Sequence, residues 1–513
     1  MIITDNHNKL ALKNRLMKML WPLILFHLLL APIHAAGRPN ILFIAVDDLR
    51  PELGCYGKEY IASPHIDRLA NSGMVFVRAY CQQAVCSPSR SSLMTGLRPD
   101  STKVWDLETH FRTAVPNVVT LGQHFKDNGY FVQGFGKIFH GGFDDEPTWS
   151  VPWQTPKAVR YALPENRETS QSQPSSSAAG QSSSASTKNA KNNRASKKSK
   201  NARGPAFESA DVPDNTFQDG KVAEMAIAAL GQMKQRNEPF FLAVGFVKPH
   251  LPFVAPKRYW DLYDPAKIQL APNKFRPKNS PEYSIQPGGE LRNYRGIPED
   301  SIPEDLARQL RHGYYACISY MDAQVGRLLD ELDKLNLRKN TIIVLWGDHG
   351  WKLGEHDAWC KHSNVENDVN APLILSVPNM ATAGRHTRAL VEFVDIYPTL
   401  TELAGLPLPS HLEGASFKSL LEDPNRPWKT AAFSQYPRSQ DGGLMGYSMR
   451  TDRYRMTQWL DRNDHSRVVA TELFDHQTDP QENENLAGLP EHTDLVKQLA
   501  SQLAAGWKAA LPR

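Results

Sequence analysis

The sequence predicts an α/β fold: a large mixed, mostly parallel sheet flanked by helices, followed by a smaller C-terminal antiparallel α+β subdomain. The main observation is a set of three short, continuous apolar runs, at residues 40–46, 239–247 and 341–346. Runs of this kind are typical of strands that are buried on both faces of a parallel sheet. After about Ser410 the apolar residues alternate in shorter segments, which favours antiparallel strands.

The segments between these runs complete the expected sheet and its helices. Further strands are predicted at residues 74–80, 130–135 and 372–377. Apolar residues at helical spacing predict helices at residues 64–73, 118–128, 217–233, 302–335 and 391–404. The C-terminal part is expected to contain strands at 445–449, 453–459 and 469–474 and a closing helix at 495–504.

The first 36 residues have the pattern of an export signal. Four basic residues precede an apolar run at residues 19–30, and the small residues Ala35 and Ala36 follow it. A membrane anchor is the alternative, but the run contains Pro22 and His27 and is shorter than the roughly 20 apolar residues that a span needs. We therefore expect an exported protein, in a periplasmic, extracellular or lysosome-like compartment, with no stable membrane span.

The mature chain divides by composition into two parts. Residues 37–409 are expected to form the main domain and residues 410–513 the C-terminal subdomain. Within the main domain, residues 165–204 are rich in Ser, Asn, Ala and Lys and nearly lack large apolar side chains, so we expect a disordered insertion there.

The charge and cysteine content exclude two further classes. The formal net charge is +4, but residues 1–36 supply three of these charges and seven basic residues crowd into 188–203. The remainder is about −6, so we expect no binding to nucleic acid. Five cysteines are too few for a disulfide-built scaffold. The sequence leaves open whether four of them pair: Cys55, Cys81, Cys317 and Cys360.

Acidic residues follow two of the buried strands directly. Asp47 and Asp48 come after residues 40–46, and Asp348 and His349 come after residues 341–346. The carboxyl ends of central strands are where open α/β sheets place their ligand sites. Three carboxylates meeting there would repel one another without a cation, and oxygen ligands suit Ca²⁺ or Mg²⁺. Solvated turn residues are the alternative interpretation.

The most specific stretch of the chain runs from Cys86 to Gly96, with the sequence Cys-Ser-Pro-Ser-Arg-Ser-Ser-Leu-Met-Thr-Gly. Pro88 and the flanking serines suit the first turn of a helix. Cys86 would then lie where unpaired N–H groups and the helix dipole favour a tetrahedral anion. Arg90, one turn later, could point back at the same anion. A buried cysteine before an ordinary helix is the alternative for a shorter motif.

Other cations and imidazoles also follow predicted strands. Lys137 and His140 come after residues 130–135, His250 comes after residues 239–247, and Lys361 lies in a later loop. Lysine and histidine at strand ends suit the binding of an anion and the movement of protons. Surface lysines beside packed histidines would give the same pattern, so these residues alone decide nothing.

Taken together, these motifs resemble type I sulfatases of the alkaline phosphatase-like superfamily, in the iduronate-2-sulfatase branch. The resemblance covers nearly all of the mature chain. Five runs carry it, at residues 46–57, 82–90, 247–253, 347–356 and 445–450. His349 stands where many sulfatases have asparagine, and histidine at this position is typical of that branch.

The resemblance implies a metal site and a modified residue. One Ca²⁺ would be held by Asp47, Asp48, Cys86, Asp348 and His349. A formylglycine-generating enzyme would oxidise Cys86 to formylglycine (3-oxoalanine), whose hydrate is the nucleophile of the family.

The resemblance also implies roles for the remaining candidates. Arg90 would help to activate the nucleophile, and Lys137 and Lys361 would neutralise the sulfate oxygens. His250 would protonate the leaving alcohol, and His140 would take a proton from the second hydroxyl of the hydrate. The counterpart of Trp351 lies at the substrate pocket in that branch, where the indole could cover a sugar ring.

The expected activity is hydrolysis of a sulfate ester on a sulfated sugar, with a 2-O-sulfated uronate as the expected substrate. One alternative is a phosphomonoester or phosphonate hydrolase of the same superfamily, although two-metal phosphatases need ligands beyond the one compact set found here. The other is a non-catalytic binder of sulfated glycans with unmodified Cys86, which would not need the proton-transfer residues. No Gly-x-Ser-x-Gly motif supports a serine hydrolase.

Overall fold

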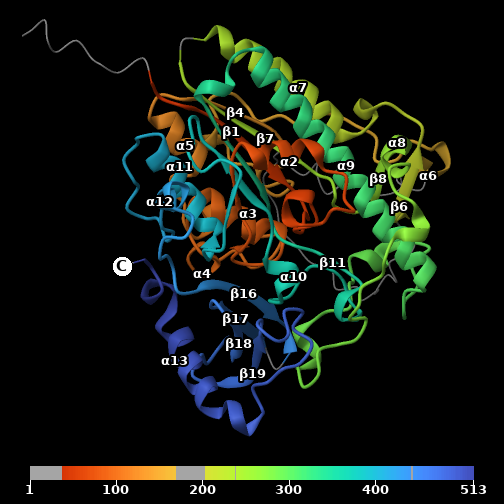
Figure 1. Cartoon of the computed structure of the whole chain (residues 1–513), viewed down its shortest axis with the longest axis vertical. Helices are drawn as coiled ribbons and strands as arrows, with labels where there is room; N and C mark the ends of the chain where they lie inside the picture. The colour runs from red at the N-terminus through yellow and green to blue at the C-terminus, as the bar shows by residue number, and fades with distance from the viewer. Residues whose placement is uncertain (1–36, 169–202, 237, 441–442, 513) are drawn as a thin grey trace, which may run out of the picture. The chain divides into compact units, whose positions relative to one another are not determined.

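The computed structural model describes residues 37–168, 203–236, 238–440 and 443–512 (Figure 1). The predicted export signal at residues 1–36 and most of the predicted insertion at 165–204 therefore lie outside the described residues. Within the described ranges, no helix combines the length and apolarity that crossing a bilayer requires. The described residues from position 40 onward form one compact unit, and its architecture is described below.

The core of this unit is a seven-stranded mixed sheet in the order β14-β2-β13-β10-β1-β7-β4. Four neighbouring strands, β10, β1, β7 and β4, are parallel, whereas β13 pairs antiparallel with both β10 and β2. The prediction of a mixed, mostly parallel sheet is confirmed. The bounds are β1 Asn40–Val46, β2 Met74–Phe76, β4 Phe131–Gly136, β7 Phe240–Phe246, β10 Thr341–Gly347, β13 Leu373–Ser376 and β14 Arg385–Thr387.

Helices cover both faces of the sheet because alternate residues of its buried strands point to opposite sides. Leu42 and Ile44 of β1 pack into the core formed with α2, α7 and α9, whereas Ile41 and Phe43 pack into the core formed with α3, α5 and α11. The long helices α7 and α9 lie side by side in Figure 1. The bounds are α2 Pro64–Asn71, α3 Cys86–Thr95, α5 Leu121–Asp127, α7 Gln218–Gln235, α9 Glu304–Lys334 and α11 Ile396–Leu403.

Two predicted elements differ from the structure. The strand expected at 74–80 is divided into β2 and a separate short strand, β3. The helix expected at 391–404 is divided into a 3-10 turn at Phe393–Asp395, which begins at a capping box between Glu392 and Asp395, and α11, which begins at Ile396. The other short elements are β3 Ala79–Tyr80, β5 Arg203–Pro205, β6 Phe207–Ala210, β8 Phe253–Pro256, β9 Tyr294–Arg295, β11 Lys352–Leu353, β12 Trp359–Cys360, β15 Val391–Glu392, α4 Pro99–Thr102, α6 Pro164–Glu168, α8 Lys257–Trp260, α10 Glu366–Val369 and α12 Lys418–Glu422.

The register of the sheet places the predicted acidic residues at one edge. Val46 pairs with Gly347 on one side and with Phe246 on the other. The three strands β1, β7 and β10 therefore end level with one another. The residues that follow them, Asp47 and Asp348 among them, meet at this edge.

The C-terminal part forms an antiparallel sheet in the order β16-β17-β18-β19, with helix α13 against it (blue in Figure 1). Three of these strands and the helix are where the sequence predicted them. The fourth, β16, contains Pro437, and it lies at the edge of the sheet, where a proline is tolerated. The bounds are β16 Ala432–Arg438, β17 Leu444–Arg450, β18 Tyr454–Asp461, β19 Val468–Asp475 and α13 Thr493–Ala509.

A buried ion network connects this sheet to helix α10. The side chain of Arg455 on β18 is 1% exposed and pairs with Glu482 at 2.5 Å and with Glu366 of α10. His476 Nε2 lies 2.8 Å from Glu482, and the backbone N–H of Glu366 donates to the same carboxylate. The arginine therefore balances two carboxylates that have little access to water.

We expect Arg455→Ala to lower the free energy of unfolding by about 3–5 kcal/mol, because it leaves buried Glu482 without its cation. Urea denaturation followed by tryptophan fluorescence measures the effect. Arg453→Ala is the matched control, since Arg453 pairs with Asp475 on the same sheet but its side chain is 47% exposed. Equally small changes in both variants would show that the buried network adds no net stability.

Candidate active site

Four of the predicted metal ligands lie together at the carboxyl ends of β1 and β10. Asp47, Asp48, Asp348 and His349 are all 0% exposed. The backbone N–H of Asp48 donates to Asp348 Oδ1 at 3.0 Å. His349 Nε2 lies 3.4 Å from Asp48 Oδ1 and 3.6 Å from Asp348 Oδ1. Because Nδ1 of the same ring faces the carbonyl of Gly350 at 3.0 Å, Nε2 is directed toward the carboxylates.

Cys86 joins this group from the start of α3. Val85 is the N-cap, and Cys86 is 2% exposed. Its Sγ lies 3.4 Å from Asp47 Oδ1, 3.5 Å from His349 Nε2 and 3.7 Å from Lys137 Nζ. The five predicted ligands thus form two overlapping trios that share Cys86, and within each trio the ligand atoms lie within 4.8 Å of one another.

This donor set fits Ca²⁺. Three carboxylates supply the hard oxygen ligands that the ion prefers. Burial raises the pKa of Asp48 even though Lys361 opposes the shift. Burial would also raise the pKa of Asp47, but Lys137, His250 and Arg90 outweigh it and hold that pKa well below its usual range. A divalent ion would stabilise both carboxylates in their charged form.

Arg90 holds the carboxylates in place. Its side chain is 0% exposed, with Nε donating to Asp348 Oδ2 at 2.8 Å and Nη2 to Asp47 Oδ1 at 3.2 Å. Nη1 donates to the backbone carbonyls of Lys137 and Ile138. The sequence predicted that Arg90 points at a bound anion, but in the structure its donors are directed at the protein. Its position is that of a residue which orients Asp47 and Asp348.

Two lysines lie on either side of the acidic residues. Lys137 pairs with Asp47 Oδ2, and Lys361 Nζ lies 3.0 Å from Asp48 Oδ1. Burial would lower the pKa of each lysine, but these carboxylates outweigh that effect and raise it. Both side chains therefore remain cationic and can face an anion.

Trp351 lies behind Lys361 rather than open to a ligand. It is 1% exposed, its ring centroid is 4.8 Å from Lys361 Nζ, and it packs edge-on against Phe253. The structure therefore places the predicted sugar platform under the lysine, where it supports the cation.

The two predicted proton-transfer histidines differ in their surroundings. His250 is 21% exposed, its Nδ1 lies 2.6 Å from the carbonyl of Leu251, and its Nε2 lies 3.8 Å from Asp48 Oδ2. Asp219 fixes the loop by accepting hydrogen bonds from two backbone N–H groups just before His250. Burial, with a contribution from Lys137, lowers the pKa of His140 to about 3. His140 is therefore neutral near pH 7.

The sequence did not indicate two further residues of the site, Glu290 and His362. Glu290 lies 3.1 Å from His250 Nε2 and 2.9 Å from Lys361 Nζ. His362 Nδ1 lies 2.6 Å from the hydroxyl of Tyr436, which belongs to the C-terminal sheet. No motif or periodicity marks either residue. For His362, its place directly after Lys361 was the one available signal.

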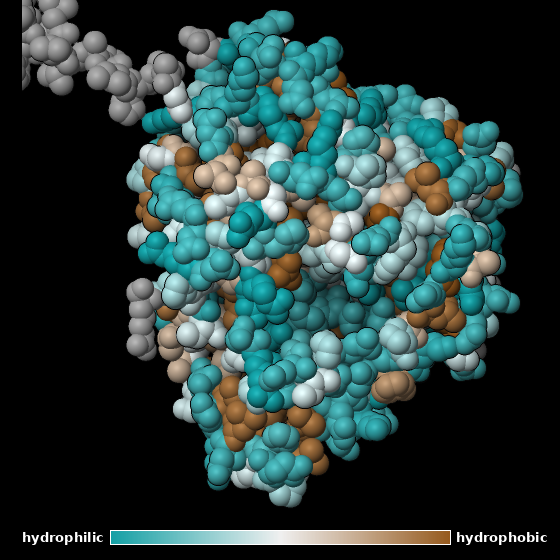
Figure 2. All heavy atoms as spheres, in the orientation of Figure 1, coloured by the Kyte–Doolittle hydropathy of each residue, from teal (hydrophilic) through white to brown (hydrophobic). Residues whose placement is uncertain are grey.

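Arg438 of β16 completes this side of the site. It donates to the carbonyl of His362 at 2.6 Å and to that of Ser284 at 2.9 Å. The C-terminal sheet therefore holds the loop that carries Lys361. That loop runs between β12 and α10, and Figure 2 shows a hollow lined by hydrophilic residues at this place.

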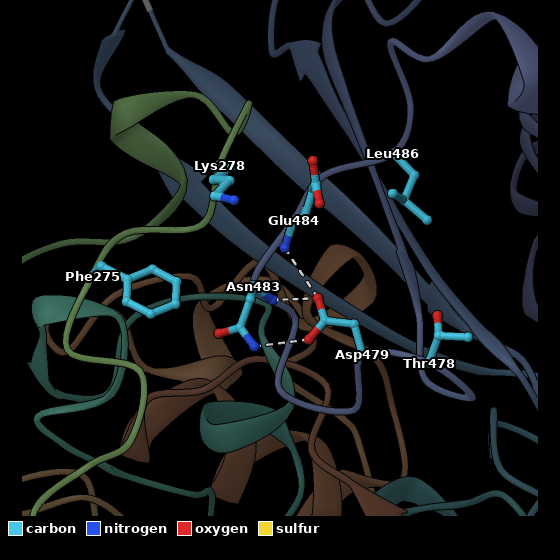
Figure 3. A pocket seen from close by; sticks show the side chains of 7 residues that line it. All are labelled: Phe275, Lys278, Thr478, Asp479, Asn483, Glu484 and Leu486. Atoms are coloured by element: carbon cyan, nitrogen blue, oxygen red, sulfur yellow. Dashed lines mark hydrogen bonds between the residues drawn. The ribbon is translucent and has the colours of Figure 1, made fainter.

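A separate pocket of about 380 Å³ contains none of the predicted site residues (Figure 3). Asp479 in its wall accepts hydrogen bonds from the backbone and side chain of Asn483 and from the backbone of Glu484. These contacts fold the loop itself. The lining residues are Phe275, Lys278, Thr478, Asp479, Asn483, Glu484 and Leu486.

Comparison with known families identifies the family to which a chain with this site belongs. The sulfatase family model matches residues 39–406, which is most of the chain. The chain belongs to the sulfatase family. A second model, the C-terminal part of N-sulphoglucosamine sulphohydrolase, matches residues 354–508 of this sulfatase. The protein is thus a sulfuric ester hydrolase, as the sequence motifs predicted.

Individual relatives agree with this assignment. Mouse iduronate 2-sulfatase is 37% identical over 536 residues, which cover 90% of this chain and 93% of the relative. Among solved structures, a complex with the substrate D-glucosamine-2-N,6-O-disulfate has a TM-score of 0.70 at 22% identity and covers 92% of this chain and 98% of its own. The phosphonate monoester hydrolase of Silicibacter pomeroyi has a TM-score of 0.69 at 20% identity, covering 92% and 96%. These structures confirm the predicted fold.

Proposed function

We propose that this sulfatase removes an O-sulfate from a sulfated sugar, with a 2-O-sulfated uronate as its substrate. The convergence of Cys86, the acidic ligands and two buried lysines at one sheet edge is the observation that carries the proposal. The likeness to iduronate 2-sulfatase supports the uronate. Export, as predicted from residues 1–36, would bring the enzyme to sulfated polysaccharides in a periplasmic, extracellular or lysosome-like compartment.

Two groups that the family generally uses would complete the site. Asp47, Asp48, Asp348, His349 and the oxidised side chain of Cys86 would hold one Ca²⁺, which supplies a Lewis acid beside the sulfate. A formylglycine-generating enzyme would convert Cys86, and the hydrated aldehyde supplies the hydroxyl that attacks sulfur. The buried position of Cys86 among the ligands supports this assignment.

The remaining side chains bind, orient and move protons. Lys137 and Lys361 bind the sulfate oxygens and offset the charge that grows on them. Arg90 orients Asp47 and Asp348. His250 donates a proton to the leaving oxygen of the sugar, and neutral His140 accepts a proton from the hydrated side chain at position 86.

A phosphonate or phosphomonoester hydrolase is the second candidate, favoured by the fold of the phosphonate monoester hydrolase. A two-metal phosphatase would need a second ligand set. In the part of the chain that the structure describes, one further cluster shares no residue with this site, namely Glu366, His476 and Glu482, and it is already paired with Arg455. This supports a single-metal site. A non-catalytic binder of sulfated glycans would leave His140 and His250 without a role.

Hydrolysis of matched sulfate and phosphate esters tests the proposal. We expect a higher kcat/KM for a disaccharide ending in 2-O-sulfated uronate than for the same sugar bearing phosphate, because the described residues supply one compact ligand set rather than the two that a two-metal phosphatase needs. A peptide mass across Cys86 from the native host should show the aldehyde in place of the thiol. Faster release of phosphate would overturn the sulfatase specificity, and an untouched thiol in active enzyme would overturn the nucleophile.

A further inference from the structure

Glu290 occupies the space between two side chains that the proposed function assigns to the substrate. One carboxylate oxygen, Oε1, lies 3.1 Å from His250 Nε2, and the other, Oε2, lies 2.9 Å from Lys361 Nζ. His250 already uses Nδ1 at the carbonyl of Leu251, and Lys361 is paired on its other side with Asp48. Glu290 therefore accepts from the donors of His250 and Lys361 that would otherwise be available to a ligand.

A carboxylate and a sulfate group present similar contacts to such a pair of donors. Each offers two oxygens on one central atom, and each carries negative charge. In its present position Glu290 bridges a leaving-group acid and a sulfate-binding cation, as two oxygens of a bound sulfate ester would. Neighbouring cations, with Lys361 foremost, hold the pKa of Glu290 well below its usual range in spite of its burial, so the mimic is charged.

We propose that Glu290 is a placeholder for sulfate, which the substrate must displace, and that it thereby sets the affinity of the site for substrate and for free sulfate. This inference rests on the proposed function, because it takes Lys361 and His250 as sulfate and leaving-group contacts. Both anions cannot share the two donors, since like charges at contact distance cost several kcal/mol.

The chain next to Glu290 allows the side chain to leave. The side chain is 17% exposed, so it lies at the open side of the site. Gly288 has a φ of +98°, which favours glycine, and an added Cβ would come within 3 Å of Trp359. Gly289 is in open space on its side-chain side. Gly288 is therefore held close to Trp359, whereas the open space at Gly289 leaves room for the Glu290 side chain to turn outward when an anion enters.

Calorimetric titration of the Ca²⁺-loaded protein with inorganic sulfate tests the placeholder. Glu290→Gln keeps the shape but removes the charge, and we expect it to bind sulfate about tenfold more tightly than the wild type. Glu282→Gln is the matched control, because Glu282 is an exposed glutamate of the same loop and loses the same charge. An unchanged or weaker affinity in Glu290→Gln would overturn the proposal, as would equal tightening in both variants.

A second variant separates occupancy from a charge effect at a distance. Glu290→Ala leaves a space of carboxylate size, so we expect acetate to bind there and to weaken sulfate binding in this variant but not in the wild type. If acetate has no effect on sulfate binding in Glu290→Ala, the proposal that the Glu290 carboxylate occupies the sulfate position is wrong. These titrations measure the binding of sulfate and need no turnover. Inactivity toward every sulfate ester would therefore refute the proposed function, whereas the titrations alone decide whether Glu290 occupies the position of a bound sulfate.

Discussion

Cys86→Ala is expected to abolish the turnover of sulfate esters, with a fall in kcat of about 10⁴-fold or more. Alanine removes a side chain whose sulfur contacts Asp47, His349 and Lys137, and with it any nucleophile derived from that sulfur. The fold should survive, because the start of α3 depends on backbone hydrogen bonds that alanine retains. Steady-state kinetics and circular dichroism measure the two properties separately.

Cys81→Ala provides the matched control. Cys81 is also fully buried, on the segment that leads to α3, but its Sγ reaches only the carbonyl of Asp368, at 4.0 Å. We expect this variant to keep activity close to that of the wild type. Near-normal activity in Cys86→Ala would refute the nucleophile, and equal losses in both variants would show that the effect arises from packing.

The edge of the sheet could be predicted because its signals are local. Each of β1, β7 and β10 is a continuous apolar run, and the residues that follow must emerge at the same edge once the strands pair in parallel. Asp47 and Asp348, 301 positions apart in the sequence, are thus brought together by two short patterns. The start of α3 at Cys86 was likewise predicted from its own neighbours.

The direction of individual side chains could not be predicted in the same way. Helical spacing places Arg90 one turn after Cys86, but it does not say whether carboxylates or an anion will use the guanidinium. Two buried carboxylates lie within reach, and a buried arginine pairs with them first. Trp351 follows the proposed metal ligands Asp348 and His349 in sequence, yet its packing with Lys361 and Phe253 buries it.

Contacts made by distant loops could not be predicted from the sequence. Glu290 lies in a segment without regular periodicity and reaches the site only because that loop folds back over Lys361. Tyr436 and Arg438 are on β16, which Pro437 made difficult to recognise as a strand. The side of the site that Glu290, Tyr436 and Arg438 form is therefore recognised only from the structure. The sequence motifs beside it can be recognised from the sequence alone.

The size of the fall in kcat in His250→Asn should depend on the leaving group of the substrate. For a sulfated sugar we expect kcat to fall about 10²–10⁴-fold, because an alcohol is a poor leaving group and needs the proton that we propose His250 Nε2 supplies. For a nitrophenyl sulfate we expect a fall of less than about tenfold, since a nitrophenolate leaves without protonation. Parallel kinetics with the two esters measure this contrast.

His386→Asn is the control, because His386 is exposed and only contacts the carbonyl of Cys55; neither ester should be affected. The position of His250 allows two roles, since its Nε2 faces both Glu290 and the proposed metal ligand Asp48. The fall in kcat caused by losing a proton donor depends on the leaving group, whereas the fall caused by losing a sulfate contact does not. Equal losses for both esters would therefore place the contribution of His250 in holding the sulfate and remove it from the protonation step.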